Sequence, residues 1–376
     1  MFILNLKRRI YSKINTNWVK FKHYIQLIIE EIFAYFFLLF YKKYSNSDAH
    51  IKKIILLCRF KNYGNKDDVS TEKIHLDDTL FNYDAEVIVF YWDAISRIGT
   101  NLINFIKIII QVKPELIVFS SYSPRIKRPI TQPSRFILKI LKNKFFINSI
   151  IAIWWDTCSD KFTKMYFSKQ TIFDLHIIVD NPTLNLDYNS INKFEIDKIL
   201  ALFPPYNINS YFYPFKKDIN YSFLGQIDSY RSYRKEYITF LDNCNIKGVL
   251  KFDNRAKQIT HKEYCEILGK SKIGINFSFS VDKHQIKGRV FEFIMSGALL
   301  LESKNDQIEK LFDENIEYVS FNTKEDMYEK IKYYLKHETE RALIVKNALD
   351  KINSKYNGTI FWQTIFNKLN LDICLK

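Results

Sequence analysis

Two basic side chains and one carboxylate stand close together at the start of an apolar helical pattern. In KGRVFEFIMSGALLL, residues 287–301, Lys287 and Arg289 lie where a loop enters the helix. Free backbone N–H groups and the positive end of the helix dipole favour an anion at such a point, and both cations can neutralise a diphosphate. Glu292, one turn further on, can accept hydrogen bonds from ribose hydroxyls. These residues predict a nucleotide-diphosphate site. The alternative is an Arg289–Glu292 pair within the helix, which contributes roughly 0.2–0.5 kcal/mol.

Alternating strands and helices would position this site. The helix is expected to end near Gly297, between the strand-like runs at residues 272–280 and 298–303. NYSFLGQ, residues 220–226, is expected to open the same domain, with Gly225 ending its first strand. A glycine there allows the backbone to approach a ligand closely. The predicted site therefore lies at the carboxyl ends of the strands of a parallel sheet.

Residues 287–335 resemble the donor-binding half of a GT-B glycosyltransferase. They are most similar to the CgeB-like (spore-maturation-type) branch of the glycosyltransferase family 1/4 superfamily. The matching positions are Lys287, Gly288, Arg289, Phe291, Glu292, Gly297, Glu317, Val319 and Phe321. The resemblance implies an α/β GT-B fold, in which two Rossmann-like domains face a cleft. It also implies donor binding by Lys287, Gly288 and Arg289 and ribose binding by Glu292.

Other residues take roles from the same resemblance. A basic residue about six positions after Gly225 touches the donor phosphates in the superfamily, which implies Arg231, with Arg234 as a near neighbour. The superfamily carries a first Glu where this chain has His284. The resemblance implies retention of configuration, but this departure leaves the stereochemistry open. His284 and Asp156, an acidic residue after a predicted strand, are the candidate catalytic residues. The alternative for Asp156 is a helix cap.

The first half of the chain predicts a second parallel sheet. Apolar strands are expected at residues 51–60, 85–93, 115–123, 149–157 and 173–181, separated by helices. No glycine-rich fingerprint follows the first strand, which disfavours a dinucleotide-dependent enzyme. Asp77 and Asp78 do not close a predicted strand and are expected to face solvent, so we assign no metal and no cofactor.

These patterns divide the chain of 376 residues into five parts. Residues 1–50 form a basic and apolar helical segment, and residues 51–203 an acceptor-binding Rossmann-like domain. Residues 204–219 form a linker, residues 220–356 the nucleotide-sugar domain, and residues 357–376 a helix that returns to the first domain. Five cysteines without metal-ligand spacing favour a reducing compartment with free thiols.

The N-terminal segment and the net charge of +15 point to anionic partners. No acidic residue precedes Glu30, and a strongly apolar run follows at residues 32–41. This run is short for a membrane-spanning helix, which needs about 20 apolar residues. We expect a helix that lies on a membrane surface; the alternative is an extra helix packed on the first domain.

The sequence therefore predicts a metal-independent, hexosyltransferase-like enzyme that moves a sugar from a nucleotide-diphosphate donor to a glycan, a lipid-linked molecule or a protein. We expect it in the cytoplasm, at the inner face of the membrane, with no specific nucleic acid as a partner. Two alternatives remain open. A nucleotide-sugar epimerase of the same fold would need no acceptor. A non-catalytic basic protein would bind membrane or nucleic acid with strong salt dependence.

Overall fold

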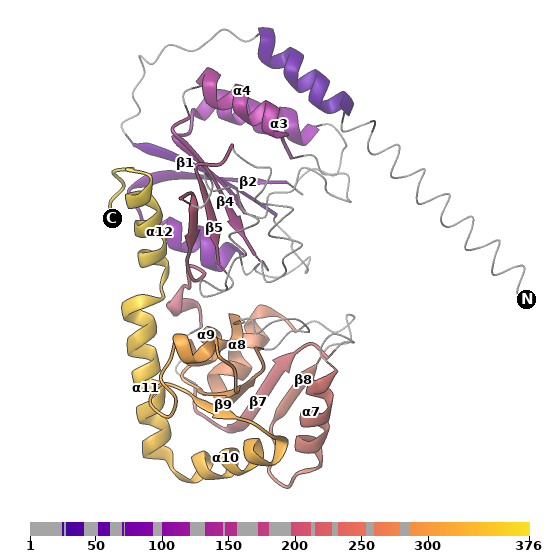
Figure 1. The fold of residues 1–376 in the computed structure, drawn as a ribbon, viewed down its shortest axis with the longest axis vertical. Helices are drawn as coiled ribbons and strands as arrows, with labels where there is room; N and C mark the ends of the chain where they lie inside the picture. The colour runs from indigo at the N-terminus through magenta and orange to yellow at the C-terminus, as the bar shows by residue number, and fades with distance from the viewer. Residues whose placement is uncertain are drawn as a thin grey trace, which may run out of the picture.

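The structure is a computed structural model that contains two α/β units, one above the other in Figure 1. The described residues are 25, 28–40, 52–60, 70, 72–92, 100–120, 132–145, 147–155, 172–179, 197–211, 215–227, 232–252, 259–278, 286 and 288–376.

The first unit is a six-stranded parallel sheet in the order β2-β1-β3-β4-β5-β6. The strands are β1 (Lys53–Arg59), β2 (Ala85–Tyr91), β3 (Leu116–Ser120), β4 (Ser149–Trp154), β5 (Leu175–Ile178) and β6 (Ile199–Ala201). The helical elements are η1 (Lys73–Asp77), α2 (Asp78–Leu80), α3 (Thr100–Val112) and α4 (Arg135–Phe145). The central strands are apolar throughout because each face of the sheet is covered by its own hydrophobic core. All five strands expected in this half of the chain are present, and the short β6 is additional.

The second unit is a five-stranded parallel sheet in the order β11-β10-β9-β7-β8. Its strands are β7 (Ile219–Gly225), β8 (Val249–Phe252), β9 (Ser271–Asn276), β10 (Leu299–Ser303) and β11 (Val319–Phe321). Its helices are α7 (Tyr233–Asn243), α8 (His261–Lys270), α9 (Gly288–Met295), α10 (Lys324–Lys336) and α11 (Glu338–Lys355). Gly297 ends the turn after α9 with a φ of 72°, and the N–H of Ala298 bonds the carbonyl of Phe293. This is a glycine-terminated helix end of the kind that the sequence predicted.

The last helix, α12 (Gly358–Lys368), packs on the first unit, which Figure 1 shows beside the first sheet. The indole N–H of Trp362 donates to Thr79 Oγ1 at 2.9 Å, and the Tyr83 hydroxyl donates to the carbonyl of Thr359 at 2.7 Å. A Cβ on Gly358 would lie only 2.4 Å from the Thr79 methyl group. The absence of a side chain at Gly358 therefore lets α12 approach α2 closely.

Residues 28–40 form a helix that lies on the first unit beside α4. Ala34 and Leu38 are buried in the core under α3 and α4. The packing that the sequence left as the alternative for this segment is therefore present. The described residues contain no helix long and apolar enough to cross a membrane.

Candidate donor site at the second sheet

The order in which the chain adds strands to the second sheet reverses between β7 and β9, and Arg289 lies at this switch point. From β7 the chain passes to β8 on one side and reaches β9 on the other, so the carboxyl ends of β7 and β9 flank the crevice where α/β folds bind ligands. Gly225 ends β7 and Asn276 ends β9. Arg289 Nε donates to Asn276 Oδ1 at 3.3 Å, and its Cζ atom is 3.4 Å from where a Cβ on Gly225 would stand. The structure thus brings together Gly225 and Arg289, which are 64 positions apart in the sequence.

A buried carboxylate fixes Asn276 in this position. Glu302, at the end of β10, is fully buried and accepts hydrogen bonds from Asn276 Nδ2 at 2.6 Å and from the N–H of Ser278 at 2.7 Å. Burial raises the pKa of Glu302, and these two donors oppose the shift. Because Asn276 donates to Glu302 through its nitrogen, its oxygen faces the Arg289 guanidinium. Glu302 therefore orients Arg289 through Asn276.

Glu292 lies one turn after Arg289 and is bonded to two tyrosine hydroxyls. Tyr264, from α8, donates to Oε2 through a short hydrogen bond, and Tyr211 donates to Oε1 at 3.5 Å. Burial raises the pKa of Glu292, while the Tyr264 hydrogen bond and the charge of Arg289 lower it. Oε1 would be 3.3 Å from a Cβ on Gly288, so this carboxylate lies against the first residue of α9. Among the described residues the Glu292 carboxylate is paired with tyrosines, and the alternative of an Arg289–Glu292 ion pair is not found.

Tyr211 also connects this site to the first unit. Tyr211 OH lies 3.1 Å from Nε2 of His75, and the two rings stack with centroids 5.6 Å apart. Tyr206 packs edge-on against His75 at 4.8 Å. Burial and the nearby His261 lower the pKa of His75 to about 3, so the imidazole is neutral at neutral pH. A line of polar groups therefore runs from His75 through Tyr211 to the Glu292 carboxylate.

Arg234 has a structural position beneath the same edge of the sheet. It is fully buried in α7 and donates to the carbonyls of Phe277 at 2.7 Å and Gln226 at 3.3 Å. These carbonyls immediately follow β9 and β7, so the guanidinium holds the two strand ends together. Arg234, the near neighbour of the implied phosphate-contacting residue, is therefore bonded to the backbone of both strand ends.

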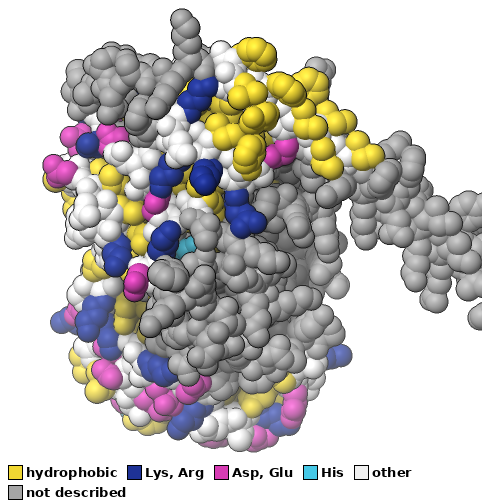
Figure 2. Space-filling view, turned by 45° about the horizontal axis from the view of Figure 1, so that its top comes forward, with side chains coloured by type: hydrophobic (Ala, Val, Ile, Leu, Met, Phe, Trp, Pro, Cys, Tyr) yellow, Lys and Arg dark blue, Asp and Glu magenta, His cyan; other side chains and the backbone are white. Residues whose placement is uncertain are grey.

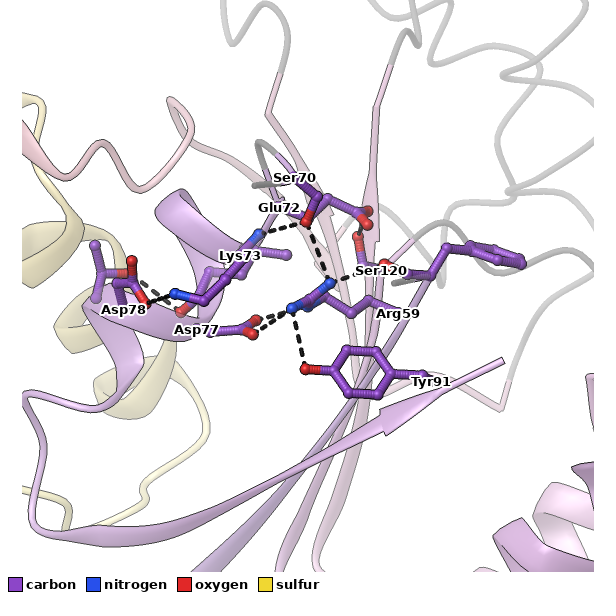
Figure 3. A network of polar contacts seen from close by, with 11 residues as sticks. Arg59, Ser70, Glu72, Lys73, Asp77, Asp78, Tyr91 and Ser120 are labelled. Atoms are coloured by element: carbon purple, nitrogen blue, oxygen red, sulfur yellow. Dashed lines mark hydrogen bonds and ion pairs between the residues drawn. The ribbon is translucent and has the colours of Figure 1, made fainter. Parts of the chain in front are cut away.

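A second polar network occupies the carboxyl edge of the first sheet (Figure 3). The strand order of the first sheet reverses between β1 and β3. The strands at this point, β1, β2 and β3, end at Arg59, Tyr91 and Ser120. Ser120 Oγ donates to Glu72 and accepts from the Trp155 indole at 3.0 Å. These side chains belong to the domain that the sequence predicted to bind the acceptor.

The network also corrects the expectation for the two aspartates. Asp77 is 2% exposed and forms a bidentate ion pair with Arg59. One of its carboxylate oxygens accepts a hydrogen bond from Arg59 Nε at 2.7 Å. Lys73 donates to the partly buried Asp78 at 2.9 Å. Asp77 therefore does not face solvent, because the Arg59 side chain at the end of β1 needs a buried counter-ion.

Four of the predicted site residues lie outside the described residues: Asp156, Arg231, His284 and Lys287. Cys58, Cys244, Cys265 and Cys374, the described cysteines, are free thiols. Within the described ranges no group of three or more His, Cys, Asp or Glu side chains could hold a metal ion.

Sequence reasoning missed Asn276, Glu302, Tyr211, Tyr264 and His75. One signal was available for Glu302, because a carboxylate stands inside the otherwise apolar strand ALLLES. Such a residue is buried at a cost unless it is hydrogen-bonded, which indicates a specific partner. The tyrosines and His75 gave no signal, since their partners come from distant parts of the chain.

Comparison with solved structures identifies the architecture. The HepE protein of Anabaena, solved with UDP, superposes with a TM-score of 0.54 at 11% identity, over 85% of this chain and 99% of that one. Two further structures each superpose with a TM-score of 0.53 at 10% identity, over 85% of this chain and 99% of the other. One is an α-glucosyltransferase solved with UDP-glucose and DNA containing an abasic site. The other is a sucrose-phosphate synthase of Thermosynechococcus elongatus. The chain has the GT-B fold.

The sequence comparisons add a family match for the second half of this GT-B chain. Residues 225–366 match a family model described as glycosyl transferase-like. No curated protein matches the chain in a sequence comparison. The matched range begins at Gly225 and includes Arg289, Glu292 and Glu302, so the switch-point site lies within a glycosyltransferase-like domain.

Proposed function

We propose that this protein is a glycosyltransferase that takes a sugar from a nucleotide-diphosphate donor bound at the β7–β9 switch point. The observation that carries the proposal is the Arg289 guanidinium, held by Asn276 over the glycine that ends β7. A cation fixed at the carboxyl edge of such a sheet suits a diphosphate. The family match over residues 225–366 and the UDP in the HepE structure support this choice of donor class.

In this proposal the basic residues stabilise the charge that develops on the departing diphosphate. Arg289 supplies a positioned guanidinium, and Lys287 and Arg231 add positive charge, as the resemblance to GT-B glycosyltransferases implies. Catalysis then proceeds without a metal ion or a cofactor. Glu292 accepts hydrogen bonds from the donor ribose, and its tyrosine partners fix the carboxylate in place.

The first unit binds the acceptor, and His284 and Asp156 act at the reacting centre with retention of configuration. Glu72 and the Trp155 ring are partly exposed, and the buried Ser120 hydroxyl bonds to both of them. They suit a sugar or another hydroxyl-bearing acceptor, because hydroxyls bond to a carboxylate while an aromatic ring packs on a sugar face. We place this activity in the CgeB-like branch and in the biosynthesis of a glycan.

The proposal is tested by binding of UDP and GDP, measured by calorimetry with EDTA present. We expect Arg289→Gln to weaken binding about tenfold or more, because a hydrogen bond to a charged group contributes about 1.5–3 kcal/mol. Arg135→Gln, an exposed arginine on α4, removes the same charge elsewhere and should leave binding unchanged. Equal affinities for wild type and Arg289→Gln would refute the site, and binding that requires Mg²⁺ or Mn²⁺ would refute metal independence.

Glu292→Gln separates its proposed role from a purely structural one. The amide keeps the size of the side chain and can still accept a hydrogen bond from Tyr264, so the fold should persist. We expect weaker nucleoside-diphosphate binding with a melting temperature close to that of wild type. Normal nucleotide affinity together with a much lower melting temperature would mean that Glu292 only joins α9 to α8 and Tyr211.

A further inference from the structure

The N-terminal helix has an apolar inner face and an apolar outer face. The inner face is buried in the first unit through Ala34 and Leu38, which are 0% and 1% exposed. The outer face carries Phe33, Phe36 and Phe40, which are 63%, 51% and 86% exposed, and they recur at helical spacing. A helix that only extended a soluble domain would present polar side chains on its outer face.

Hydrogen bonds fix the orientation of this helix. The Glu31 carboxylate accepts from the N–H of Ser134 at 2.8 Å and from its hydroxyl at 2.5 Å, at the N-terminus of α4 where a negative charge is favoured. At the other end Lys144 donates to the carbonyl of Leu38. The outward position of the phenylalanines is therefore set by contacts on both ends of the helix.

The carboxylates of the helix do not interrupt its outer face. Glu30 and Glu31 are the only charged residues between positions 25 and 40. Glu30 is 6% exposed, and Glu31 is bonded to Ser134 on the inner side. The outer face thus combines a set of exposed aromatic and aliphatic side chains with no exposed charge from this helix.

The apolar surface continues onto α4. Phe136 is 58% exposed and packs against Tyr35 with ring centroids 5.6 Å apart. Nine of the sixteen exposed large apolar side chains among the described residues belong to residues 25–40 or are Phe136. Figure 2 shows these side chains gathered at one end of the molecule, with Lys and Arg side chains along their border. We call these nine exposed side chains the apolar end face: Ile25, Ile28, Ile29, Ile32, Phe33, Phe36, Leu39, Phe40 and Phe136.

We propose that the apolar end face docks on an anionic membrane surface. The choice of occupant rests on charge: Arg135 and Lys139 are exposed beside Phe136 on α4. In the sequence, six basic residues and no acidic residue precede position 25. Apolar side chains that enter the interface, bordered by cations that attract lipid headgroups, are the combination that binds peripheral proteins to anionic bilayers. This inference is independent of the proposed donor site.

Co-sedimentation of the full chain with lipid vesicles tests the proposal. We expect binding to vesicles of phosphatidylcholine with phosphatidylglycerol, weaker binding to phosphatidylcholine alone, and weaker binding at high salt. Replacing Phe36 and Phe40 together by Gln should reduce binding to the anionic vesicles at least about tenfold, because the apolar contribution is lost. A second pair, Phe33→Gln with Leu39→Gln, should have the same effect.

The control pair is Ile316→Gln with Leu343→Gln, which removes apolar side chains that are 54% and 57% exposed on the second unit. This pair should bind vesicles as the wild type does, and melting curves should show that all variants are folded. Failure of the wild type to bind anionic vesicles, or unchanged binding of both phenylalanine pairs, would overturn the proposal. A concentration-dependent dimer that the phenylalanine variants abolish, without vesicle binding, would show that a second copy covers the face instead.

Discussion

His75 should make the first unit sensitive to acid. Burial and His261 lower the pKa of this imidazole to about 3 in the folded protein, against an ordinary value of 6.5. In the unfolded chain His75 therefore binds a proton more tightly, so stability is lost as the pH falls from about 6.5 toward 3. Between pH 7 and pH 5 this one group should lower the free energy of unfolding by about 2 kcal/mol.

Urea unfolding at pH 7, 6 and 5, followed by tryptophan fluorescence, measures this loss. The described tryptophans, Trp92, Trp154, Trp155 and Trp362, all pack in the two cores of the first unit, so their fluorescence reports the unfolding of that unit. His75 belongs to η1 of the same unit and packs against Tyr206 and Tyr211. The comparison is between wild type and His75→Gln, whose amide cannot gain a proton but can still donate to Tyr211.

The other titrating groups are common to both proteins, so the difference between them isolates His75. Wild type should lose about 2 kcal/mol more than His75→Gln between pH 7 and pH 5. If the two proteins lose the same free energy over this range, His75 is not buried as a neutral group against Tyr211. The proposed line of polar groups from His75 to Glu292 would then be wrong.

Three further variants test the contacts around the site and the domain junction. Glu302→Gln should weaken nucleoside-diphosphate binding several-fold in calorimetry, because the amide has one acceptor oxygen for two donors, Asn276 and the N–H of Ser278, and so holds Asn276 toward Arg289 less firmly; binding equal to wild type would contradict that role. Gly297→Ala should cost about 1 kcal/mol in urea unfolding because of the φ of 72°, and an unchanged midpoint would speak against this helix end. Trp362→Phe removes the hydrogen bond to Thr79 and should cost about 1–2 kcal/mol in the fluorescence transition. A stability equal to that of wild type would show that this bond contributes nothing.

The strands and helices could be predicted from the sequence because their apolar patterns are long and continuous. β1, β3 and β4 are buried on both faces, so each is a nearly unbroken apolar run bounded by polar residues. The end of α9 could be predicted because Gly297 is one of few residues that adopt a positive φ at low cost. β6 was missed because three residues, Ile199–Ala201, are too few for a pattern.

The polar contacts could not be predicted, because each depends on residues that the fold brings together. Asp77 is separated from Arg59 by 18 positions, and no local pattern distinguishes it from a solvated aspartate. Tyr211 is 81 positions from Glu292 and 136 from His75. The spacing of Arg289 and Glu292 suggested a nucleotide site and left an ion pair as the alternative. It could not show that two tyrosine hydroxyls donate hydrogen bonds to the Glu292 carboxylate.

The return of α12 to the first unit has a consequence for how the chain matures during synthesis. The core on one face of the first sheet includes six residues from the end of the chain: Phe361, Trp362, Ile365, Phe366, Leu371 and Ile373. The ribosome makes these residues after the whole second unit, so that core stays incomplete until translation reaches them. The second unit can reach its native state first, and a fragment that stops at residue 356 would leave part of the first sheet uncovered.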